Sequence, residues 1–154
     1  MPRAVRRKDR EIGVDEATRL MASGSYGILA TVDSDSQPYA IPLSYVLDGD
    51  HIYFHCALEG KKLDNIRSNS AVSFCVVGKT QTLPDKFSTE YESAIAFGTA
   101  NEIYGDEKME ALLKILEKYS PEFMAQGKTY IAAKIDATRV VKIDISHLSG
   151  KARR

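Results

Sequence analysis

The stretch from His55 to Lys62 contains the residues whose types and order point most directly to chemistry. It reads His-Cys-Ala-Leu-Glu-Gly-Lys-Lys, which is typical of a strand that passes through Gly60 into a helix carrying both lysines. The N-terminus of a helix offers free N–H groups and a partial positive charge, and the lysines add full charges. We therefore predict that Lys61 and Lys62 seat a phosphate group. A solvated lysine pair on a helix surface explains the pattern equally well.

His55 is the candidate catalytic residue, because the ordinary pKa of imidazole, about 6.5, suits proton transfer near neutral pH. The alternative is a histidine that only hydrogen-bonds its neighbours. Cys56 is not expected to act with it, because adjacent residues of a strand point to opposite faces. Cys56 and Cys75 are interpreted as structural thiols in a reducing compartment, and a disulfide between them stays open as an alternative.

Several other kinds of site do not fit this sequence. It contains no nucleophile elbow, P-loop or zinc-ligand spacing, so we expect no metal site. Basic residues gather in 1–10 and 151–154, whereas residues 11–150 carry 13 basic and 20 acidic side chains. An acidic body repels a polyanion, so we expect no nucleic-acid partner.

The length and hydropathy of the chain suit a single domain over residues 1–154. Its 154 residues are 44% hydrophobic, enough for one substantial core. The longest apolar runs are only a few residues, and residues 1–10 lack the apolar stretch of a secretory signal. We therefore expect a cytoplasmic protein with no membrane partner.

Strands are expected to deliver the chain to His55. Residues 16–22 are predicted to form a short helix capped by Asp15. Alternation with period two then predicts strands at 26–32, 39–47 and 52–57, paired as an antiparallel meander. The apolar face of the first strand is predicted to consist of Tyr26, Ile28, Ala30 and Val32.

Beyond His55, each predicted helix is followed by two predicted strands. The predicted elements are a helix at 60–68, a strand at 72–76, a strand at 88–104 with a bulge at Gly98, a helix at 106–119 ended by Pro121, strands at 129–135 and 139–145, and a polar tail. Six or seven antiparallel strands with three short helices indicate a mainly β protein built as a small closed or partly closed barrel. Such a barrel has little interior volume, so a large ligand is expected in a groove between two copies.

Five segments, in this order, resemble the Nim family of nitroimidazole-resistance-type flavoproteins, in the pyridoxamine 5′-phosphate oxidase-like superfamily. They are MPRAVRRKDREI at 1–12, GILATV at 27–32, PYAIPLSY at 38–45, IYFHCALEGKK at 52–62 and ISHLSGK at 145–151. The resemblance implies an antiparallel FMN-binding split β-barrel that forms a homodimer, with flavins in grooves at the subunit interface. FMN is the expected cofactor, and FAD is possible.

The resemblance also implies which residues contact the flavin. The ring is expected against Ile41, Pro42, Leu43, Ser44 and Tyr45, the cofactor edge beside His55 and Ala57, the phosphate on Lys61 and Lys62, and the partner subunit's closing residues at Tyr91, Ser93 and Lys151. For Ser44, a hydroxyl bonded only to backbone is the alternative.

The implied activity is flavin-dependent reduction of small electrophilic or nitroaromatic compounds, with His55 as proton donor. The alternatives are a non-catalytic flavin-binding or flavin-sensing protein and a haem-binding split-barrel protein. The arginine-rich substrate segments of pyridoxamine phosphate oxidases proper are not found here, so vitamin B6 oxidation is not expected.

Overall fold

The computed structural model describes residues 2–154. Its elements are β1 (Glu11–Ile12), α1 (Val14–Ser23), β2 (Gly27–Val32), β3 (Pro38–Leu43), β4 (Val46–Asp48), β5 (His51–Cys56), α2 (Lys61–Ser68), β6 (Ala71–Leu83), β7 (Ser88–Ile103), α3 (Gly105–Tyr119), α4 (Met124–Lys134) and β8 (Arg139–Arg153). Short 3-10 turns lie at Pro84–Lys86, Pro121–Phe123 and Ile135–Ala137.

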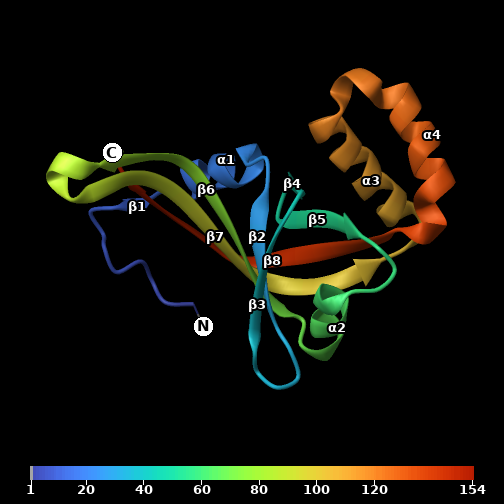
Figure 1. Cartoon of the computed structure of the whole chain (residues 1–154), viewed down its shortest axis with the longest axis horizontal. Helices are drawn as coiled ribbons and strands as arrows, with labels where there is room; N and C mark the ends of the chain where they lie inside the picture. The colour runs from blue at the N-terminus through green and yellow to red at the C-terminus, as the bar shows by residue number, and fades with distance from the viewer. Residues whose placement is uncertain (1) are drawn as a thin grey trace.

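The strands form one antiparallel sheet with the order β3-β2-β6-β7-β8-β5-β4, and β1 pairs with the last part of β8. The long strands β6, β7 and β8 twist through the centre of the molecule, and the β6–β7 hairpin projects beyond the rest (Figure 1). Strands β3 and β4 lie at opposite edges of this order. The sheet of residues 2–154 is therefore open rather than closed into a barrel.

The main core lies on one face of the sheet. Leu29, Phe54 and Phe74 are fully buried there, and helices α1 and α2 add Met21 and Leu63. These helices cover that face because their apolar side chains lie on one side of each helix.

A second, smaller core lies under α3. Its Leu112 and Ile115 pack with Tyr53 of β5 and Val140 of β8. Both faces of strand β5 are therefore buried. Ile52 and Phe54 pack in the main core, and Tyr53 packs in the smaller core under α3. This arrangement places α3 and α4 as a hairpin at one end of the molecule (Figure 1).

The helices at 60–68 and 106–119 are confirmed to within one residue. The β7–β8 register does shift between Phe97 and Gly98, but the extra residue is Ser146 of β8, so the bulge lies opposite Gly98 and not on its own strand. A Cβ at Gly98 would overlap the Asp144 carbonyl, which explains the glycine. The capping prediction was wrong. Helix α1 begins at Val14, its N-cap is Gly13, and Asp15 lies in the first turn.

The strand predicted at 129–135 is wrong, because residues 124–134 form helix α4 and 135–137 a 3-10 turn. A short apolar run such as Tyr130-Ile131 fits either period. Tertiary packing decides in favour of the helix. Gly127 lies so close to Leu116 of α3 that a Cβ would overlap it, so α4 packs tightly on α3. The structure thus has four α-helices in residues 2–154 instead of three.

Four other strand predictions also needed correction. The buried face of β2 consists of Gly27, Leu29 and Thr31, whereas Tyr26 is 58% exposed. The predicted strand 39–47 is broken between β3 and β4. Strands β6 and β8 continue to 83 and 153, because the long β7 offers them pairing partners over that length. The segment expected to be a polar tail is therefore strand.

Candidate functional site

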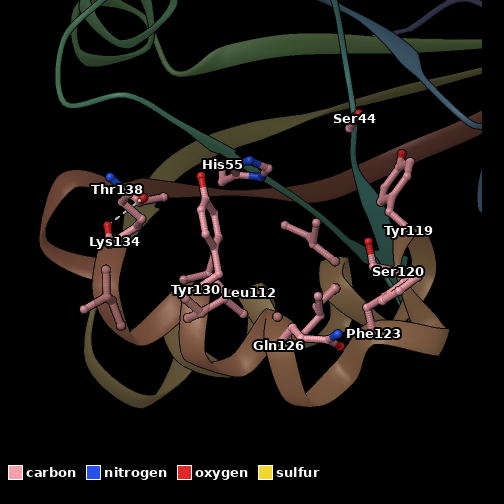
Figure 2. A pocket seen from close by; sticks show the side chains of 15 residues that line it. Ser44, His55, Leu112, Tyr119, Ser120, Phe123, Gln126, Tyr130, Lys134 and Thr138 are labelled. Carbon is pink, nitrogen blue, oxygen red and sulfur yellow. Dashed lines mark hydrogen bonds between the residues drawn. The ribbon is translucent and has the colours of Figure 1, made fainter.

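A cavity of about 610 Å³ lies between the α3–α4 hairpin on one side and Ser44, in the break between β3 and β4, and His55 of β5 on the other. Figure 2 shows the helical side chains on one side of this space and Ser44 and His55 on the other. Leu112, Phe123 and the neighbouring aliphatic residues of both helices make this wall mainly apolar. The volume falls in the usual range of small-molecule sites, roughly 300–1,000 Å³.

His55 lies at the sheet side of the cavity and its side chain is partly accessible. It follows the fully buried Phe54 on β5, so the alternation of the strand turns the imidazole away from the main core. Desolvation by burial and the positive charge of Lys62 lower the pKa of His55 below its ordinary value. Both effects favour the neutral imidazole over the imidazolium. The side chain of Tyr130 points from α4 toward it (Figure 2).

Helix α2 places the two lysines next to this histidine. It begins at Lys61, and Leu63 and Asn65 anchor it, since Leu63 packs in the main core and Asn65 Nδ2 donates to Thr31 Oγ1 at 2.9 Å. The charge of Lys62 acts on His55, whereas the Nζ of Lys61 lies 5.1 Å from the ring centroid of Tyr39 on β3. A positively charged helix start thus borders the histidine end of the cavity.

The segment 41–45 divides into exposed and buried residues. Pro42 and Ser44 are exposed, and Ile41 and Leu43 are partly buried and pack against the main core. Tyr45 is fully buried, with its ring edge-on to Phe74 at a centroid distance of 4.7 Å. Ala57 is exposed in the loop that connects β5 to α2. Only Ser44 of the segment 41–45 lines the cavity.

Tyr91, Ser93 and Lys151 lie together, away from the cavity beside His55. Ser93 pairs with Lys151 across the β7–β8 ladder, whereas His55 pairs with Val140 near the beginning of β8. The path along β8 between these two points is about 36 Å. Within one chain the two groups of residues therefore do not meet.

The Tyr91 group is strongly basic. Desolvation opposes ionisation of Tyr91, but hydrogen bonds from Arg10 and Lys151 outweigh it and lower the pKa of this phenol. Such a group suits an anion, because several positive donors converge on one point.

The cysteines and acidic residues offer no further chemistry. Cys56 and Cys75 are both free, and desolvation raises the pKa of each thiol. Among residues 2–154, no group of three or more His, Cys, Asp or Glu side chains is placed to hold a metal ion. No helix in this part of the chain is both long and apolar enough to cross a membrane.

The helical wall of the cavity was not predicted from the sequence. Tyr130 was missed because residues 129–135 were interpreted as a strand, and Phe123 and Gln126 were missed because no helix was predicted between Pro121 and residue 129. A usable signal was present: residues 123, 127, 130 and 134 follow the three- and four-residue spacing of one helix face.

The fold is shared with solved structures of low sequence identity. A candidate 5-nitroimidazole antibiotic resistance protein from Bacteroides thetaiotaomicron is 20% identical, with a TM-score of 0.79 over 92% of this chain and 86% of that one. An FAD-binding protein from Mesorhizobium loti is 22% identical (TM-score 0.68, 94% and 98%). An FAD- and haem-binding protein from Mycobacterium smegmatis is 20% identical (TM-score 0.81, 94% and 74%).

At these identities the likeness concerns the fold alone. A comparison with curated proteins found no significant match. The profile of the family described as pyridoxamine 5′-phosphate oxidase, however, matches residues 13–152, which is nearly the whole chain. The chain therefore belongs to the pyridoxamine 5′-phosphate oxidase family.

Proposed function

We propose that this protein is a flavin-dependent oxidoreductase of the Nim type, which binds FMN and reduces small electrophilic or nitroaromatic compounds. The observation that carries the proposal is the position of His55. It stands between a cationic helix start and a mainly apolar cavity of about 610 Å³. This order of charge and apolar surface matches a flavin nucleotide next to a small aromatic substrate.

The residues fit a flavin in three respects. Lys61 and Lys62 at the start of α2 suit its phosphate. Strand β3 is an edge strand, so its outer backbone groups are free to bond the polar rim of a ring. Pro42 and Ser44 present their side chains beside that edge. When bound, a flavin supplies the electrons for reduction of a substrate, which the protein binds and orients.

His55 would then act as the proton donor. A neutral imidazole carries one N–H and can hold a substrate acceptor, and its imidazolium form is the stronger acid. The apolar side chains of α3 and α4 exclude water and stack against an aromatic ring.

The charge in the cavity argues against a phosphorylated substrate. Lys134 is the only fully charged side chain among the residues that line the cavity, and no arginine is present there. Vitamin B6 phosphates need stronger anion binding than one lysine at the end of α4 provides.

A homodimer completes the site in this proposal. One face of β2, β6 and β7 is uncovered and partly apolar, with Ile28, Cys75 and Ile95 in register and Phe97 nearby. A second copy packed on this face could bring its basic Tyr91, Ser93 and Lys151 group to the flavin of the first, which one chain alone cannot do.

Purified protein tests the proposal directly. We expect flavin absorbance in protein isolated without added cofactor, and NAD(P)H-dependent reduction of a nitroaromatic compound. Bound flavin without turnover supports a non-catalytic flavin-binding or sensing protein. A Soret band in place of flavin absorbance supports a haem-binding protein and overturns the proposal.

A further inference from the structure

We propose that Tyr119, assisted by Lys118, is the positioning residue of the flavin site. It fixes the break between β3 and β4, and thereby the place of Pro42 and Ser44. This inference rests on the proposed function and assigns a task to the end of α3, which is remote in sequence from the predicted flavin residues.

Side chains at the end of α3 form hydrogen bonds with the backbone N–H and C=O groups of Tyr45. This residue lies in the break between β3 and β4. Its N–H donates to the Tyr119 hydroxyl at 3.0 Å, and its carbonyl accepts from Lys118 Nζ at 2.9 Å. Two consecutive side chains of a helix thus replace the strand partner that Tyr45 lacks. Buried backbone groups without a partner are strongly destabilising, so these contacts hold the break in one conformation.

The same hydroxyl ties the break to the neighbouring strand. Tyr119 donates to the carbonyl of Ser25 at 2.8 Å, two residues before β2 begins. The hydroxyl therefore bridges the segments that lead into β2 and out of β3, the two strands of the sheet edge.

Tyr45 is also fixed through its side chain. Its hydroxyl donates to the Met21 carbonyl, and Lys118 Nζ lies 3.8 Å from its ring centroid. Desolvation lowers the pKa of Lys118, as expected for an ammonium packed against a buried ring. Because residue 45 cannot move, the adjacent Ser44 is held at the cavity.

Tyr119 belongs to the cavity as well as to this network. Its ring lines the cavity near Ser44 (Figure 2). Its hydroxyl already lies within hydrogen-bond distance of three backbone groups, the Tyr45 N–H and the carbonyls of Ser25 and Tyr45, so it is suited to positioning and not to proton transfer. The helical hairpin that forms the substrate wall is thereby connected rigidly to the strand edge that faces the flavin.

The test compares Tyr119→Phe with Tyr104→Phe, the same change at an exposed tyrosine just before α3. Tyr119→Phe keeps the ring and removes the acceptor for Tyr45 N–H. We expect hydrogen exchange at the Tyr45 amide of cofactor-free protein to rise about tenfold or more. The Kd for FMN should rise at least fivefold, and the visible absorption of the bound flavin should shift. Tyr104→Phe should change none of these.

Lys118→Met is the second variant, and it should give the same direction of change in Kd through the Tyr45 carbonyl. A purely structural role predicts a lower melting temperature with unchanged Kd and flavin spectrum in both variants, and that result overturns the inference. If the wild-type protein binds no flavin, the proposed function fails together with this assignment. If the wild type binds flavin and the variants bind it equally well, only the assignment fails.

Discussion

Removal of the lysines at the start of α2 should separate recognition of the phosphate from recognition of the ring. A charge-assisted hydrogen bond contributes roughly 1.5–3 kcal/mol, which corresponds to about 10- to 150-fold in Kd. Lys62 should lie toward the upper part of this range, because its charge already acts on His55. Lys61 should contribute less, since its ammonium also contacts the Tyr39 ring. The double variant Lys61→Ala/Lys62→Ala should therefore weaken FMN binding at least tenfold.

Riboflavin provides the decisive comparison, because it has the same ring and lacks the phosphate. Titration of cofactor-free protein, followed by quenching of flavin fluorescence, gives the Kd of both ligands for each variant. Riboflavin affinity should change little. Lys86→Ala, an exposed lysine at the tip of the β6–β7 hairpin, is the matched control and should bind both flavins as the wild type does. Equal losses for FMN and riboflavin would show that the lysines act through the fold, and the phosphate assignment would then be refuted.

Three further predictions concern catalysis and assembly. His55→Ala should keep bound flavin but reduce kcat about 10²–10⁴-fold. The control His51→Ala, at the other end of β5, should change kcat little. Steady-state rates measured at matched flavin occupancy will test both expectations. Because the pKa of His55 is lowered, its imidazolium forms only at pH values below the ordinary imidazole pKa, so kcat should rise as the pH falls below about 6.5. Lys62→Met removes the neighbouring positive charge and should move that rise in kcat to higher pH. An unchanged profile would exclude this coupling. Ile95→Asp, on the uncovered sheet face, should convert a dimer to monomers in light scattering, and a monomeric wild type contradicts the homodimer.

Local signals allowed the sequence to predict the secondary structure around His55, Lys61 and Lys62. The order of strand, glycine and lysines between His55 and Lys62 occupies one short stretch, so its geometry depends little on distant contacts. The structure confirms β5 followed by α2 with both lysines at its start. An irregularity near Gly98 was predictable for the same reason, since a glycine inside a strand often marks a bulge or a close approach of another backbone; here the Asp144 carbonyl approaches Gly98 and the extra residue lies on β8.

Features that depend on tertiary contacts were not predictable in this way. Both faces of β2 carry apolar side chains, so alternation alone could not tell that Leu29 faces the core and Tyr26 does not. The break at Tyr45 exists because Tyr119 and Lys118, more than 70 residues away, satisfy its backbone. Helix α4 is selected by packing on α3. In each case a contact between distant segments, and not the local spacing of apolar residues, determines the structure.

This division has a consequence for specificity within the proposed function. Within one chain, the residues expected at the flavin ring and phosphate lie on β3 and the break after it, at the end of β5 and on α2, whereas the wall expected to contact substrate comes from α3 and α4. Substitutions at Phe123, in the 3-10 turn before α4, or at Tyr130, on the cavity side of α4, can therefore change the shape of the substrate space without altering the cationic start of α2. Two residues of the α3–α4 hairpin, Tyr119 and Lys118, contact the backbone of Tyr45 next to the expected flavin site, and both lie at the end of α3. Substrate range should accordingly vary with α4, and cofactor affinity with α2 and the end of α3.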